Sequence, residues 1–189
     1  LDEIDGATSA VKRRSSVASG KEGPIDVAAW SEHAGHAMGP MPPVTCSPTW
    51  AQPSASGAKI YVACNKSNEI LEIDRDAWTV SRRFATGVGP YNLAVTPDGR
   101  LLVASLKKGG GVQVFDLESG RSVMEAKSST TLSHGVAISP DSRYAFVTSE
   151  GVGSDPGKVD VYDLVTFSRV GTVDVGQQAG GIAFWKMEA

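Results

Sequence analysis

At 189 residues, with 41% hydrophobic and 21% charged residues, the chain has the size and composition of one globular domain with a substantial core. Its net charge of −3 lacks the positive surface that nucleic acid or an anionic membrane requires. No apolar stretch approaches the roughly 18 residues that span a bilayer. We therefore expect neither a nucleic-acid partner nor a membrane span.

Residues 1–18 are expected to form two short strands. The segment LDEIDGATSAVKRRSSV at 1–17 aligns with ILEIDRDAWTVSRRFAT at 70–86, and in both segments two strand-like stretches flank a turn. Glycine and proline, with 21 and 10 copies, break the chain into short elements that favour strands over helices. Because the later segment closes a longer repeat, we interpret 1–18 as the end of a unit whose first two strands are absent from this chain.

Three full copies of the repeat follow this opening segment. The turns TPDGR and SPDSR of the last two copies place Asp98 and Asp141 43 residues apart, and each turn separates two apolar stretches. A strand that ends in aspartate is a further marker of the repeat. We place the copies at 47–88, 89–131 and 132–178. The strand-ending aspartates are Asp5, Asp74, Asp116 and Asp163.

The copy at 47–88 departs from the other two. It has SASGAK where the others have a PDG-type turn, and Pro53 stands in the preceding strand. Proline cannot donate a hydrogen bond to a sheet ladder. We therefore expect the first strand of this copy to be irregular.

Each copy contains four strand-like stretches, which in the second copy lie near 91–96, 100–105, 111–116 and 121–126. Four strands in about 40–45 residues are typical of a β-propeller blade. We predict an all-β fold, a β-propeller of four-stranded antiparallel blades with about three complete blades and partial ones at both ends. The last segment, 179–189, aligns with the start of the preceding copy and is expected to be a closing strand.

The expected total of 15 strands is too small for four complete blades, whereas closed propellers typically have about 4–8 blades. Three hypotheses account for the difference. The chain is a piece of a longer protein that carries further blades, or two copies assemble into one ring as a homodimer, or the last strand closes a compact four-bladed ring.

An insertion separates the opening segment from the first full copy. Asp5 and Asp74 are 69 residues apart, whereas Asp74 and Asp116 are 42 apart, a difference of 27. We assign the inserted loop to 19–46. It contains the stretch EHAGHAMGPMPP, which is rich in groups that can bind a metal.

The repeats resemble those of the YVTN or YncE-like family of β-propeller proteins. The resemblance rests on YNLAVTPDGRLLVAS, HGVAISPDSRYAFVTSE and KIYVACNKSNEILEID, and it covers 47–189 well and 1–18 in part. It implies a propeller but is weakly specific for function. Proteins with such repeats include extracytoplasmic binding proteins, surface-layer proteins, lactonases that act on phosphogluconate, and nitrite reductases that hold a d-type haem.

The first strand of each propeller blade lines a central channel, and function resides in the loops at its mouth. Aligned at the starts of these strands, Thr49, Tyr91, His134 and Gly180 are equivalent. A ligand at the channel mouth, either a small molecule or a protein, would contact this region. The alternative is that the aromatic side chains pack between blades and the histidine bonds to backbone. The candidate ligand-binding residues are Trp50, Tyr91, Asn92, His134 and Glu150.

The two cysteines, Cys46 and Cys64, should approach one another. Cys46 precedes the first strand of its blade and Cys64 ends the second, and the two strands are antiparallel. In an exported protein such a pair forms a disulfide, whereas in a reducing compartment the two are free thiols, which are soft ligands for copper or zinc.

The inserted loop is a candidate copper or zinc site. Imidazole and thioether groups together suit copper, and a Gly- and Pro-rich segment can fold around an ion. The alternative is a loop that caps the channel without binding metal. The candidate metal ligands are His33, His36, Met38 and Met41.

Catalysis has little direct support in the sequence, which contains no GxSxG nucleophile motif. We expect a non-catalytic binding or scaffolding propeller, with a metal-binding or lactonase-like enzyme as the alternative. The chain has no signal peptide pattern of its own. The family resemblance nevertheless implies a periplasmic or extracellular location.

Overall fold

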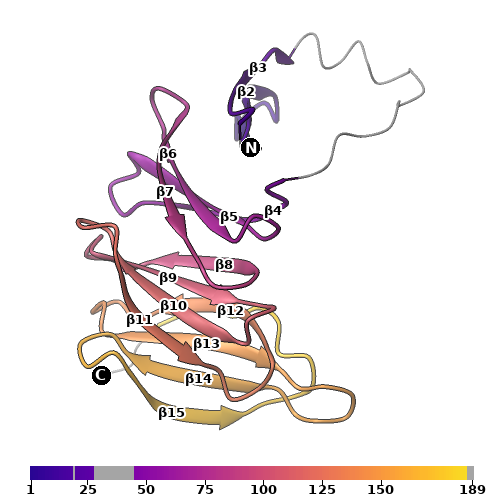
Figure 1. The fold of residues 1–189 in the computed structure, drawn as a ribbon, viewed down its shortest axis with the longest axis vertical. Helices are drawn as coiled ribbons and strands as arrows, with labels where there is room; N and C mark the ends of the chain where they lie inside the picture. Colours follow the sequence, from indigo (N-terminus) through magenta and orange to yellow (C-terminus); the bar gives the residue numbers. More distant parts are fainter. Residues whose placement is uncertain (19, 28–44, 187–189) are drawn as a thin grey trace.

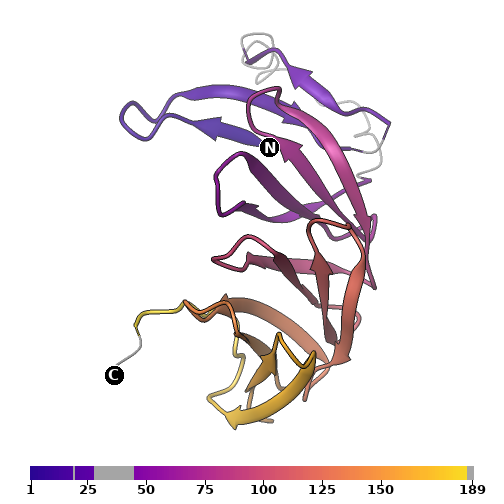
Figure 2. The same ribbon diagram turned by 90° about the vertical axis from the view of Figure 1, so that its left-hand side faces the viewer.

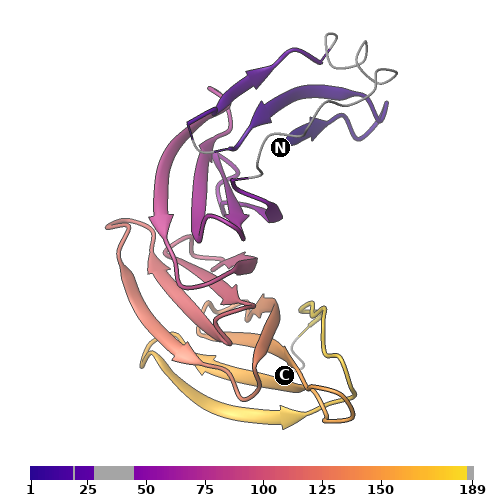
Figure 3. The ribbon, with the colours of Figure 1, turned by 45° about the vertical axis from the view of Figure 1, so that its right-hand side comes forward.

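The computed structural model describes residues 1–18, 20–27 and 45–186, which form four antiparallel sheets stacked in chain order (Figure 1). Each sheet corresponds to one predicted blade, and we number them accordingly. The stack curves into an open arc (Figures 2 and 3). The predicted all-β fold with four-stranded blades is confirmed, with three four-stranded sheets and one three-stranded sheet among the described residues.

Blade 1 contains β1 (Asp2–Ile4), β2 (Val11–Ser16) and β3 (Gly23–Ile25). Blade 2 contains β4 (Pro48–Pro53), β5 (Lys59–Cys64), β6 (Glu69–Asp74) and β7 (Thr79–Ala85). Blade 3 contains β8 (Pro90–Val95), β9 (Leu101–Leu106), β10 (Gly111–Asp116) and β11 (Ser122–Lys127). Blade 4 contains β12 (Leu132–Ile138), β13 (Tyr144–Glu150), β14 (Lys158–Asp163) and β15 (Ser168–Asp174).

Two details of the expected organisation differ at the ends. The region 19–46, expected to be a loop, contains β3, which pairs with the outer edge of β2 and satisfies backbone groups there. The segment 179–186 is not a strand, although the carbonyl of Gly180 accepts a hydrogen bond from the amide of Gly135 at 3.0 Å. A side chain at Gly135 would prevent this contact, because a Cβ there would stand 2.8 Å from that oxygen.

The first strand of blade 2 is irregular, as expected, but the irregularity is not at Pro53. Strand β4 pairs with β5 as far as Pro53, and its single register shift lies near Pro48, in the same place as the shifts at the starts of β8 and β12. Pro53 is tolerated because β4 is an edge strand of its sheet and Pro53 is its last residue.

The hydrophobic core lies between neighbouring blades. One cluster joins blades 2 and 3, and it includes an edge-to-face contact between Phe84 and Phe115 at 5.5 Å. A second cluster around Tyr162 joins blades 3 and 4, and a third, which includes Trp78, joins blades 1 and 2. Burial of both faces of the inner blades therefore holds the arc together.

The strand-ending aspartates have a structural role. Each carboxylate accepts hydrogen bonds from groups in the turn after its strand, as Asp74 does from the amides of Asp76 and Ala77 at 3.0 and 2.9 Å. Such side-chain to backbone bonds stabilise turns. The repeated aspartate therefore stabilises a turn and is not evidence of a binding site. The other three carboxylates that act in this way belong to Asp5, Asp116 and Asp163.

Candidate functional site

The first strands of blades 2, 3 and 4 are neighbours, because β4 contacts β8 and β8 contacts β12. At each of the two boundaries a hydroxyl of one blade donates to a main-chain carbonyl of the next, and a hydroxyl of blade 4 does the same to the segment that follows that blade. The three acceptors are the residues that the sequence alignment made equivalent. The donor and acceptor pairs are Thr49 with Tyr91, Ser105 with His134, and Thr148 with Gly180, at 2.8, 2.5 and 2.6 Å.

His134 and Glu150 meet at the open end of the β12–β13 hairpin. Nε2 of His134 lies 2.6 Å from Oε1 of Glu150, and the two side chains are 11% and 22% exposed. The register shift between Ser133 and Val136 accompanies this approach. The contact is within ion-pair distance, although its angles do not meet those of a hydrogen bond. The imidazole is therefore held against a carboxylate.

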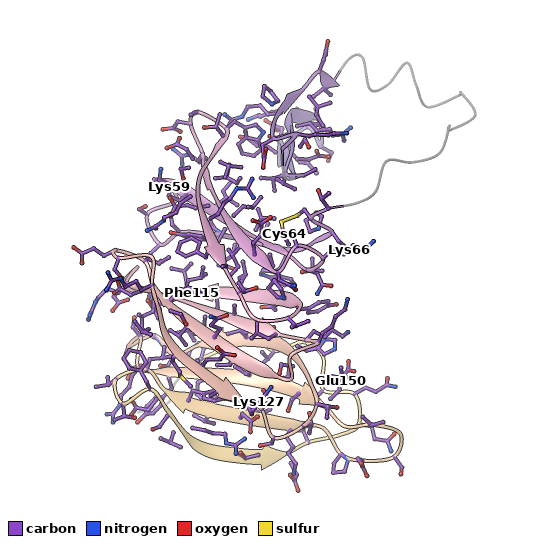
Figure 4. The ribbon with its side chains drawn as sticks, in the orientation of Figure 1. Lys59, Cys64, Lys66, Phe115, Lys127 and Glu150 are labelled. Atoms are coloured by element: carbon purple, nitrogen blue, oxygen red, sulfur yellow. A yellow bond between two sulfur atoms is a disulfide. The ribbon has the colours of Figure 1, made fainter. Side chains whose placement is uncertain are left out.

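Blade 3 contributes two further side chains beside the contact between His134 and Glu150. The ring of Tyr91, on β8, meets the ring of His134 edge to face at a centroid distance of 4.9 Å. Nζ of Lys107, the residue after β9, stands 4.6 Å from the centroid of the Tyr91 ring. These four side chains form what we call the rim cluster, which spans the boundary of blades 3 and 4: Tyr91, Lys107, His134 and Glu150. Figure 4 shows Glu150 on the same side of the stack as Cys64 and Lys66.

The charges of the rim cluster do not neutralise one another. Burial lowers the pKa of His134 below its ordinary value, the charge of Lys107 lowers it further, and the charge of Glu150 acts in the opposite direction. A neutral imidazole leaves the Glu150 carboxylate without a charged partner. Within the described part of the chain, Lys107 likewise lies within ion-pair distance of no carboxylate.

Asn92 follows Tyr91 in β8 and is 7% exposed. Its main-chain amide donates to the hydroxyl of Ser105 at 3.0 Å, and that hydroxyl donates in turn to the main-chain carbonyl of His134. In the described structure, Oδ1 of Asn92 and the hydroxyl of Ser149 have no hydrogen-bond partner, although both atoms are buried. Buried polar atoms without partners are uncommon in folded proteins and need a reason.

Trp50 is not part of the contacts around His134. Its side chain is directed along its own strand, with Nε1 3.5 Å from Oε1 of Gln52, and the residue is 44% exposed. The aromatic partner of His134 is Tyr91. Trp50 is equivalent to Asn92 and not to Tyr91, and successive residues of a strand point to opposite faces.

Sequence reasoning missed Lys107. Asn65 and Lys107 follow the second strands of blades 2 and 3, and Glu150 ends the second strand of blade 4. The antiparallel hairpin brings each of them to the start of the first strand. Asn65 accordingly donates to the carbonyl of Pro90 at 3.2 Å. The same argument that paired Cys46 with Cys64 could have identified this position.

Cys46 and Cys64 form a disulfide with a sulfur–sulfur distance of 2.05 Å. Both residues are buried in the core between blades 1 and 2. The bond therefore fixes the start of blade 2, where the described chain resumes at residue 45, to the second strand of that blade.

The candidate metal ligands His33, His36, Met38 and Met41 lie outside the described residues. Within 1–18, 20–27 and 45–186, no group of three or more histidine, cysteine, aspartate or glutamate side chains could hold an ion. Copper or zinc binding by the inserted loop stays a prediction. The same ranges contain no helix long and apolar enough to cross a membrane.

A polar pocket of about 520 Å³ lies between blades 2 and 3. Two ion pairs compensate part of its charge: Lys59 binds Asp74 at 2.7 Å, and Arg82 binds Glu72 at 2.6 Å.

Comparison with known proteins identifies the fold. No family model and no curated protein matches the chain. Among solved structures, hydrazine synthase of Kuenenia stuttgartiensis is similar, with a TM-score of 0.67 and 23% identity over 77% of this chain and 41% of that one. U3-55K matches with a TM-score of 0.63 and 16% identity, over 73% of this chain and 42% of that one.

The WD40 repeats of RRP9 are also similar, with a TM-score of 0.62 and 16% identity over 73% of this chain and 41% of that one. The chain thus spans less than half the length of these three structures. The predicted β-propeller architecture is confirmed. At these identities the likeness concerns the fold alone, and it does not distinguish a YncE-like chain from other propellers.

Proposed function

We propose that this chain is a non-catalytic binding propeller of the YncE-like type, which takes a small molecule or a protein at the rim cluster. The observation that supports the proposal is a pair of uncompensated opposite charges at one blade boundary. Lys107 makes no ion pair within the described residues, and the neutral imidazole of His134, whose Nε2 lies 2.6 Å from Oε1 of Glu150, leaves that carboxylate without a charged partner. A bound ligand would satisfy groups that are otherwise costly to bury.

Nuclear magnetic resonance with a chemically mixed fragment library tests this proposal. We expect amide shifts that cluster on β8, β12 and the end of β13, and that shrink in Glu150→Gln. The matched control is Glu118→Gln, which removes an exposed carboxylate from the turn after β10. Fragments that bind elsewhere, or shifts that persist unchanged in Glu150→Gln, would refute the rim cluster as the site.

The proposal includes a periplasmic or extracellular location. The Cys46–Cys64 disulfide supports it, because such bonds persist mainly in oxidising compartments. Thiol alkylation of the protein taken directly from its native cells tests the location. Protection of both cysteines is expected, and two alkylated thiols would argue for a reducing compartment.

A homodimer that completes a ring is part of the same proposal, because the open arc leaves blade faces uncovered (Figure 3). Sedimentation equilibrium distinguishes the states: a mass twice that of the chain supports the dimer, and a monomer mass across the concentration range contradicts it.

A lactonase-like hydrolase is the second candidate function, and the contact between His134 and Glu150 favours it. A neutral imidazole positioned by a carboxylate can act as a general base toward water. Activity against a panel of sugar lactones, lost in His134→Ala, would support hydrolysis. Absence of turnover by the unaltered protein would leave binding as the function.

A further inference from the structure

We propose that the rim cluster recognises a small zwitterion, a molecule of amino-acid type that carries an ammonium group and a carboxylate a few bonds apart. This inference rests on the proposed function and specifies the chemistry of its ligand. Two opposite charges at the boundary between blades 3 and 4, those of Lys107 and Glu150, support it.

Lys107 supplies the positive charge. Its ammonium group is held over the Tyr91 ring at 4.6 Å and makes no ion pair within the described residues. Contact with an aromatic face stabilises a cation without neutralising it or using its N–H donors on an anion. The ammonium group is therefore positioned in advance and can donate to a ligand carboxylate.

Glu150 supplies the negative charge. Its neighbour His134 has a lowered pKa, so at neutral pH the imidazole does not neutralise the carboxylate. The two oxygens of the Glu150 carboxylate are acceptors. An ammonium group has three donors and no acceptor, which makes it the complement of a carboxylate.

The two charges together select against ions of a single sign. A simple cation at the rim cluster is attracted by Glu150 but repelled by Lys107, and a simple anion meets the reverse arrangement. Lys107 and Glu150 do not bind one another, because no ion pair joins them at 4.0 Å or less in the described structure. A zwitterion can contact both charges at once and gains from each.

Three probes test the inference: L-alanine, propionate, which lacks the ammonium group, and ethylammonium, which lacks the carboxylate, each titrated into labelled protein at constant ionic strength. We expect L-alanine to bind at least about tenfold more tightly than either ion, a difference that one well-placed charged hydrogen bond supplies. Lys107→Met should abolish the advantage over ethylammonium, and Glu150→Gln the advantage over propionate. Lys107→Arg, which keeps the charge, should retain binding.

The controls are Lys127→Met and Glu118→Gln, which remove charges outside the rim cluster and should leave the order of affinities unchanged. Equal affinity for L-alanine and ethylammonium, or an unchanged order in both rim variants, would overturn the zwitterion. Library fragments that bind at the rim cluster while L-alanine does not would refute this inference and leave the proposed function standing. No response to any compound would refute both.

Discussion

The hydroxyl of Ser105 donates a hydrogen bond of 2.5 Å to the main-chain carbonyl of His134 and accepts one of 3.0 Å from the amide of Asn92. Ser105 belongs to blade 3 and His134 to blade 4. One fully buried hydroxyl therefore joins two blades at the residues that carry the candidate site. The geometry of that site depends on how the blades pack.

Ser105→Ala should lower the free energy of unfolding by about 1–3 kcal/mol, because a buried amide and a buried carbonyl lose their partner. Urea denaturation followed by tryptophan fluorescence measures the change. Ser154→Ala, at an exposed position in the β13–β14 loop, is the control and should have little effect. Equal midpoints for the two variants would show that the hydroxyl does not join the blades.

Loss of the disulfide should destabilise the protein by about 3 kcal/mol, because the bond closes a loop between cysteines 18 residues apart. The measurement is the urea midpoint with and without a reductant. The double variant Cys46→Ser/Cys64→Ser should resemble the reduced protein and should not respond to reductant. A midpoint that is the same in oxidised and reduced protein would contradict the prediction.

Acid should destabilise the protein through Asp74. The hydrogen bond from Lys59, together with the turn amides, lowers the pKa of this carboxyl to about 2. A lowered carboxyl pKa adds stability above the unfolded-state value near 3.9, and that contribution is lost as the pH falls from about 4 to about 2. Urea midpoints measured across this interval should fall less steeply in Asp74→Asn. An unchanged slope would contradict the assignment, and Asp155→Asn, an exposed carboxylate in a loop, serves as the control.

His134 should titrate below 6.5, because burial and Lys107 lower its pKa. Glu150→Gln should lower the pKa further, and Lys107→Met should raise it, because each removes one neighbouring charge. Proton resonances of the imidazole ring, assigned by comparison with His134→Ala, give the value. A buried histidine with a lowered pKa also makes stability fall as the pH drops below about 6.5. A pKa at or above 6.5 would show that the imidazole is not desolvated.

The sequence by itself determined the all-β repeat, the strand boundaries to within a residue in blade 3, and the equivalence of Tyr91 with His134. These features are local. Apolar alternation, turn residues and the turn-capping aspartates recur because each blade forms the same kind of antiparallel sheet. The irregularity expected at Pro53 was misplaced for the same reason. The sequence shows a proline within a strand but does not show whether that strand lies at the edge of its sheet, where a proline is tolerated.

Only the tertiary structure decided which side chains meet. The contact of Tyr91 with His134 crosses a blade boundary, and a register shift lies at the start of each of the two first strands. Neither blade packing nor such shifts follow from periodicity. The lowered pKa of His134 and the unsatisfied Oδ1 of Asn92 exist because packing of neighbouring blades removes both side chains from water.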